Sequence, residues 1–207
     1  AVLAQPDWHD AEAFRAMGRP RLGVFIGAGN LDSMVAHYTA AKRRRSEDFY
    51  SPGKRTGCRP DRAAIVYANR CREAFGDVPI VVGGLEASLR RFAHYDYWDD
   101  SVRRAILFDA PADLLVYGMG EAATIEIARR LKKKQSVRTM TDIPGTGYIT
   151  RDPSVCKFDH ITLPSFEDVR DDKRLYAEAT RTEYAEHDPI RGRAMIQPCE
   201  GRYLIIN

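Results

Sequence analysis

A group of chemically versatile side chains follows the apolar run 78–82 of this chain. Gly83 and Gly84 end the run, and Glu86 lies just beyond them, at the start of what reads as a helix. A strand that ends in glycines and opens into a helix is typical of the ligand-binding edge of an α/β sheet. The segment 83–98 combines an acid, two guanidinium groups, an imidazole and a phenol, contributed by Glu86, Arg90, Arg91, His94, Tyr95 and Asp96. These residues predict a binding site, and the alternative is an ordinary corner with solvated charges.

Similar corners occur twice more along the chain. The apolar run 22–26 precedes Gly27, and the run 113–117 precedes the sequence Gly-Met-Gly-Glu at 118–121. Three units of strand, glycine corner and helix in series predict an α/β fold with a doubly wound parallel sheet, because parallel neighbours need helical crossovers. The Gly-x-Gly at 27–29 is not a nicotinamide-binding fingerprint, because Asp32 replaces its third glycine and would repel a pyrophosphate.

The helices expected around these strands run over residues 10–17, 59–76, 100–108 and 121–134. After residue 134 the pattern changes to short extended pieces, followed by one long polar helix from Ser165 to about His187 and a hairpin over 193–206. Ser165 and Asp168 nearly match a capping box. We therefore expect a Rossmann-like domain over 1–134 and a connector over 135–207.

Length and composition place the chain among ordinary soluble proteins. Its 207 residues suffice for one sizeable domain or for one domain with an appendage. The sequence shows neither a membrane-spanning run nor a signal peptide, so we expect a cytoplasmic protein without a membrane partner. The four cysteines, at 58, 71, 156 and 199, match neither a Cys-x2-Cys metal pair nor a disulfide framework, which predicts free thiols.

A basic stretch covers residues 42–62. It contains eight Lys or Arg and three Asp or Glu, so its local charge is +5. Such a stretch binds the phosphates of RNA or of a nucleotide, or it is simply a solvated loop. Both interpretations stay open.

Several long strings resemble one family. The segments 59–63, 67–74, 82–91, 93–98 and 163–166 are similar to the N-terminal region of the YgiQ family of radical SAM proteins, which are Fe-S oxidoreductase-like. The resemblance covers nearly the whole chain. It implies a Rossmann-like fold similar to cobalamin-binding domains, followed in the parent protein by a radical SAM core.

The resemblance also implies the cofactors. In that family, a Cys-x3-Cys-x2-Cys motif on the core holds a [4Fe-4S] cluster, which binds S-adenosylmethionine. This chain lacks the motif, so we expect a fragment that is not catalytic alone and has the missing core as its partner. Its role would be to position substrate or cofactor beside that core.

Site residues follow from the same resemblance. Gly83, Gly84, Glu86, Gly118, Gly120 and Glu121 would line a cofactor-binding crevice, and Arg90, Arg91, His94, Tyr95 and Asp96 would contact substrate. The two arginines could pair with an anionic substrate or with the missing core, or they could instead form structural ion pairs with Asp96, Asp99 or Asp100. Cobalamin is compatible with the resemblance, although the chain lacks the Asp-x-His-x-x-Gly string of histidine-ligated cobalamin domains. No metal ligand is expected in this chain.

Two alternatives come from other classes of protein. One is a polyanion-binding module that uses the basic stretch 42–62. The other is a structural domain that only docks on the core, with exposed apolar surface when isolated. An uncovered edge strand would also favour a homodimer.

Overall fold

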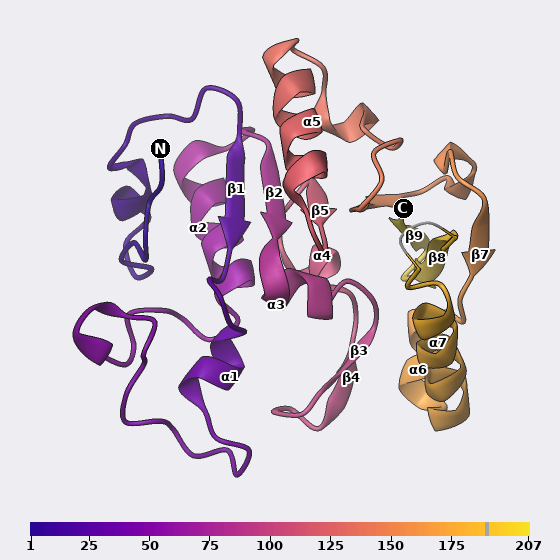
Figure 1. The fold of residues 1–207 in the computed structure, drawn as a ribbon, viewed down its shortest axis with the longest axis horizontal. Helices are drawn as coiled ribbons and strands as arrows, with labels where there is room; N and C mark the ends of the chain where they lie inside the picture. The colour runs from indigo at the N-terminus through magenta and orange to yellow at the C-terminus, as the bar shows by residue number, and fades with distance from the viewer. Residues whose placement is uncertain (189–190) are drawn as a thin grey trace.

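The computed structural model describes residues 1–188 and 191–207. A seven-stranded sheet forms its centre, in the order β1-β2-β5-β6-β9-β8-β7 (Figure 1). Its strands are β1 Val24–Gly27, β2 Ile80–Gly83, β5 Leu114–Val116, β6 Thr146–Thr150, β7 His160–Thr162, β8 Ala194–Cys199 and β9 Arg202–Ile206. A separate hairpin consists of β3 His94–Asp96 and β4 Ser101–Arg103.

The helices connect and cover these strands. They are α1 Ser33–His37, α2 Ala63–Phe75, α3 Gly84–Leu89, α4 Ile106–Asp109, α5 Glu121–Lys132, α6 Phe166–Asp171 and α7 Lys173–Ala185. Short 3-10 helices occur at Ala11–Arg15, Pro52–Lys54, Val137–Thr139 and Pro153–Val155. Within the described residues, no helix is long and apolar enough to cross a membrane.

The α/β class is confirmed. β1, β2 and β5 are parallel neighbours, as the three strand-and-helix units predict. Beyond β5 the sheet is mixed, because β6, β9 and β8 pair antiparallel in turn and β7 then pairs parallel with β8. The Rossmann-like part is therefore the β1-β2-β5 half.

Helices cover both faces of this half. Ile80 and Val82 of β2 belong to the apolar cluster that contains α2 and α4, whereas Val81 belongs to the cluster that contains α5. This alternation follows from the two-residue period of a strand. It confirms that the sheet is wound on both faces, and each face buries its own core.

Two of the expected helices are interrupted in the structure. Residues 100–108 form β4 and α4 instead of one helix, because Asp100 adopts a left-handed φ of 51° and turns the chain into the β3–β4 hairpin. The long helix after Ser165 is two helices, α6 and α7, since Asp172 between them is extended and caps α7 through the backbone N–H of Arg174. The capping box of Ser165 and Asp168 is confirmed.

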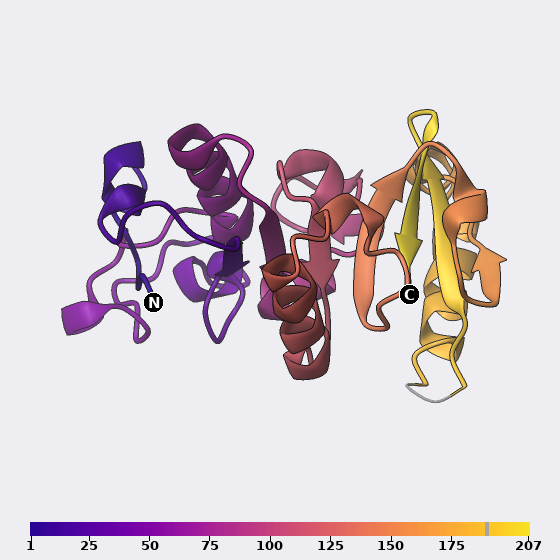
Figure 2. The same cartoon turned by 90° about the horizontal axis from the view of Figure 1, so that it is seen from above.

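The central sheet includes strands from both sides of the boundary expected between residues 134 and 135. β5 pairs with β6 through Leu115 opposite Gly147 and Val116 opposite Thr146. The predicted terminal hairpin is present as β8 and β9, joined at Glu200 and Gly201. Figure 2 shows the N-terminal segment and this hairpin at opposite ends of the molecule.

Candidate functional site

The predicted glycine corners meet at one edge of the sheet. β1, β2 and β5 are parallel, so their carboxyl ends lie together, and Gly27 is opposite Gly83 in the register. Ser88 of α3 connects two corners, because its hydroxyl donates to the carbonyl of Gly84 at 2.8 Å and accepts from the N–H of Gly118 at 3.2 Å. We call this region the carboxyl edge.

Packing and backbone conformation explain the glycines at the carboxyl edge. A Cβ on Gly83 would lie 3.1 Å from the carbonyl oxygen of Val116, and one on Gly120 would lie 2.5 Å from Cγ1 of Val116. Gly84 and Gly118 have left-handed φ values of 77° and 63°, which side chains disfavour. These steric and conformational requirements account for the four glycines without any bound ligand.

Glu86 joins two helices. Its side chain is buried, and its carboxylate accepts from the backbone N–H of Ser33 at 2.9 Å and from that of Ala64 at 2.8 Å. Ser33 and Ala64 lie in the first turns of α1 and α2, where backbone N–H groups lack helical partners. Glu86 therefore has a structural role, whereas Glu121 is exposed in the first turn of α5.

Arg90 forms a buried ion pair with Asp32. Asp32 also caps α1, accepting from the backbone N–H groups of Met34 and Val35. The alternative of a structural ion pair is thus supported for Arg90, although its partner is Asp32 and not Asp96, Asp99 or Asp100. The same contacts explain why an acid stands where a dinucleotide fingerprint needs glycine.

His94, Tyr95 and Asp96 form β3 and bond to nearby residues of the chain, to Arg62 at the N-terminal end of α2, and to Tyr176 of α7. Burial lowers the pKa of His94, and its Nδ1 lies 3.1 Å from the carbonyl oxygen of Phe92. The Tyr95 hydroxyl donates to Asp100, and Asp96 accepts from Arg62 at 2.8 Å. These contacts hold the hairpin against the N-terminal end of α2.

Arg91 differs from these residues, because part of its guanidinium has no partner. Its Cζ lies 5.2 Å from the ring centre of Phe92 and 5.3 Å from that of Tyr117, and Nη1 donates to the carbonyl of Ser88. Its Nε is buried without a hydrogen-bond partner in the described structure. Two aromatic rings thus lie against a cation whose hydrogen-bonding capacity is only partly used within the described structure.

Glu183 of α7 adds an acid near Arg91. Burial raises the pKa of Glu183 to about 7, and the positive charge of Arg91 offsets part of that rise. Near neutral pH this carboxyl can therefore hold or release a proton. Neither Tyr117 nor Glu183 was among the site residues predicted from the sequence. Tyr117 directly precedes a glycine corner, which could have marked it, but nothing in the polar sequence around Glu183 distinguishes that residue.

An exposed apolar patch borders the carboxyl edge. It consists of Leu85, Leu89 and Met119, whose exposed fractions are 43%, 58% and 89%. Leu85 and Leu89 are four residues apart and so share one face of α3. We call these residues the edge patch.

The described residues offer no site for a cluster or a cobalt ion. They contain no group of three His, Cys, Asp or Glu side chains placed to hold a metal. The four cysteines are free, as predicted, and burial raises the pKa of Cys71 to about 11 and that of Cys199 to about 12. His94, the histidine next to the corner in sequence, is bonded to backbone. The donor set therefore fits neither a [4Fe-4S] cluster nor histidine-ligated cobalamin.

The basic stretch 42–62 folds back on the protein. Five of its eight cations contact named partners: Arg59 with Asp48, Arg62 with Asp96 and Asp99, Lys54 with Glu47, Lys42 with the carbonyl of Trp98, and Arg45 with the carbonyls of Val35 and Tyr38. These contacts weaken the hypothesis of a polyanion-binding loop, because few cations remain for phosphates.

A comparison with protein families decides the affiliation. The family described as radical SAM N-terminal matches residues 1–207. The chain belongs to this family. The resemblance inferred from the sequence is thereby confirmed, and the carboxyl edge described above is that of a radical SAM N-terminal domain.

Curated relatives of this radical SAM N-terminal domain are longer proteins. A UPF0313 protein of Clostridium botulinum (strain 657 / Type Ba4) is 52% identical over 206 residues, which cover 100% of this chain and 32% of the relative. A UPF0313 protein of Clostridium perfringens (strain SM101 / Type A) is also 52% identical, with 31% of its length covered. The chain thus spans about a third of the length of these relatives. No solved structure matches it.

Proposed function

We propose that this domain covers one side of a radical SAM core in a longer protein and positions an anionic substrate there through its carboxyl edge. The family supports a core with a [4Fe-4S] cluster and S-adenosylmethionine in the parent. When bound to the core, this pair supplies hydrogen abstraction. The domain itself contributes binding and orientation.

The observation that carries the proposal is the state of Arg91. Most polar groups predicted at this edge are occupied within the domain, but the guanidinium of Arg91 keeps donors unused between the rings of Phe92 and Tyr117. Guanidinium groups bind carboxylates and phosphates through paired hydrogen bonds. Contacts with two aromatic rings hold the guanidinium of Arg91 in one orientation before a ligand arrives.

Glu183 complements this cation. Its raised pKa lets it exchange a proton near neutral pH with a substrate group held by Arg91. The edge patch supports contact with a core, because exposed apolar side chains grouped on one surface are typical of sites that bind a partner.

Covering of the edge patch can be tested by cysteine labelling of the full-length protein. Single substitutions Met119→Cys and Ile125→Cys place a thiol on the edge patch and on an exposed position of α5; Met119 and Ile125 are 89% and 68% exposed in this domain. Maleimide labelling is followed by peptide mass spectrometry, which separates these thiols from native ones. We expect Met119→Cys to react at least about ten times more slowly than Ile125→Cys if the core covers the patch. Equal rates would refute the docking arrangement.

Substrate positioning needs a separate readout. A small-molecule extract of the source cells stimulates formation of 5′-deoxyadenosine when it contains the substrate. We expect Arg91→Gln to lose most of this stimulation while the unstimulated rate persists, because the cluster lies on the core. Arg129→Gln, which changes an exposed cation of α5, serves as the matched control. Full stimulation in Arg91→Gln would contradict the role given to Arg91.

A further inference from the structure

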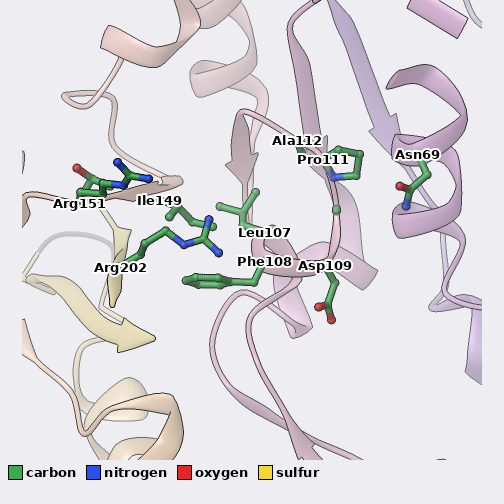
Figure 3. Close-up of a pocket in the computed structure, with 11 residues that line it drawn as sticks. Asn69, Leu107, Phe108, Asp109, Pro111, Ala112, Ile149, Arg151 and Arg202 are labelled. Atoms are coloured by element: carbon green, nitrogen blue, oxygen red, sulfur yellow. The ribbon is translucent and has the colours of Figure 1, made fainter. Parts of the chain in front are cut away.

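A pocket of about 580 Å³ opens at the opposite, amino edge of β5 (Figure 3). The segment from α4 to β5 forms its floor with Leu107, Phe108 and Ala112, and the ends of β6 and β9 add Ile149 and two arginines, Arg151 and Arg202. Pockets of a few hundred Å³ with apolar walls and a few polar groups are typical of small-ligand sites. This pocket is distant from the carboxyl edge along the strand direction, so the proposed core-facing site does not account for it.

The charges around the pocket are unbalanced. Its acid, Asp109, accepts from Arg104 at 2.7 Å and from Arg103 at 3.3 Å, so its charge is already compensated. In the described part of the chain, the guanidinium groups of Arg151 and Arg202 take part in no ion pair and no hydrogen bond. Two cations at one pocket whose only acid is already paired create a positive potential that favours an anion.

Arg202 is held in place before any ligand binds. Its Cζ lies 4.8 Å from the ring centre of Phe108, and Figure 3 shows its guanidinium over that ring and toward Leu107. The turn before it is fixed as well, because Glu200 pairs with Arg104 and its backbone N–H donates to Glu167 of α6. A cation fixed in this way loses little conformational freedom when it binds a ligand.

The apolar floor extends beyond this pocket. A neighbouring pocket of about 250 Å³ shares Leu107, Ala112 and Ile149 with the first. It continues along Met140 and Tyr148, and the charged Asp113 and Arg138 also line it. A ligand with only a charged group would leave this surface uncovered, and a polyanion would find too few cations. An anion with an apolar body fits both features.

We propose that this amino-edge pocket binds a small organic anion whose carboxylate or phosphate lies at Arg151 and Arg202 and whose apolar body covers Leu107 and Ile149. The site is independent of the proposed core-facing function. Its ligand acts as a regulator of the longer protein, since the pocket lies at the edge opposite Arg91.

The test is a titration of the full-length protein with 4-fluorophenyl phosphate, followed by ¹⁹F NMR, with 4-fluorophenol and inorganic phosphate as the partial ligands. We expect saturable binding of the complete probe and at least about tenfold weaker binding of each part, because charge-assisted hydrogen bonds and apolar contact each contribute on this scale. Arg202→Gln should weaken binding of the probe by about tenfold or more. Arg129→Gln should leave its affinity unchanged.

A second variant distinguishes loss of binding from loss of the fold. Ala112→Leu fills the floor and keeps both arginines, so it should also weaken the probe while the thermal unfolding transition stays within a few degrees of that of the unmodified protein. Three results would overturn the proposal: equal affinity for inorganic phosphate and the probe, unchanged binding in Arg202→Gln, or no binding in the millimolar range. Loss of binding in Arg91→Gln alone would assign the probe to the carboxyl edge and overturn it too.

Discussion

Asp48 and Arg59 form an ion pair in which the two side chains are only 1% and 2% exposed. Nε and Nη2 of Arg59 both donate to the carboxylate, at 2.9 to 3.1 Å, and Nη1 donates to the carbonyl of Ala28 directly after β1. The basic stretch is therefore tied to the end of an edge strand by a buried contact.

Removing one partner of this pair should be costly. We expect Asp48→Ala to lower the free energy of unfolding by about 3–5 kcal/mol, because it leaves Arg59 charged and buried without a carboxylate. The double variant Asp48→Leu with Arg59→Met should lose much less. Urea denaturation of the three proteins checks this, and a single variant within about 1 kcal/mol of the unmodified protein would contradict it.

Substitution of Glu86 should lower the stability of the fold, because its carboxylate bonds to the backbone of two helices. Glu86→Gln keeps one acceptor but loses the charged bonds to the N–H groups of Ser33 and Ala64, so we expect a loss of about 1–3 kcal/mol in the free energy of unfolding. The control Glu121→Gln changes an exposed acid at the same edge and should stay within about 0.5 kcal/mol. Similar stabilities for both variants would show that the two backbone bonds contribute little.

Val116 explains why residue 120 is glycine, and this can be tested by a double-mutant cycle. Gly120→Ala should cost about 1–3 kcal/mol, because its Cβ would lie 2.5 Å from Cγ1 of the buried Val116. In the background of Val116→Ala the same change should cost less than about 1 kcal/mol. Equal costs in both backgrounds, measured by denaturant unfolding, would exclude the steric explanation.

Glu183 should make stability depend on pH in the neutral range. Its folded pKa of about 7 exceeds the ordinary 4.5, so between these values the native state keeps a proton that the unfolded chain has lost. Its contribution to stability is therefore complete at acid pH and is lost as the pH rises through about 7. Glu183→Gln should remove this fall and be more stable at pH 8 by about 1–3 kcal/mol.

Exposed Glu178 on the same helix provides the comparison. Glu178→Gln should retain the decline between pH 5 and pH 8, measured as the free energy of unfolding at each pH. If Glu183→Gln shows the same decline as the unmodified protein, another group is responsible.

Local sequence was sufficient for some elements and not for others. The runs that became β2 and β5 are apolar and end at glycines, so their strand character and shared edge could be predicted. The β3–β4 hairpin could not, because its strands have three residues each and depend on distant partners such as Arg62, which contacts Asp96 and Asp99. A helical pattern over 100–108 was outweighed by these tertiary contacts.

The site shows the same division. The glycine corners and their common edge followed from strand direction, but the orientation of each side chain depended on packing. Arg90 and Arg91 are adjacent in sequence, yet one is bound by Asp32 and the other lies between two rings with donors unused. Glu183 comes from a helix more than ninety positions away, and only the folded structure brings its charge near Arg91.

The pairing of β5 with β6 determines where this protein can be shortened. Leu114, Leu115 and Val116 are almost fully buried, and removal of everything after residue 134 would leave them on a strand with a bare row of backbone donors and acceptors. Such a strand recruits other chains, so the shortened product would aggregate. A soluble expression fragment must therefore retain the strands through Ile206.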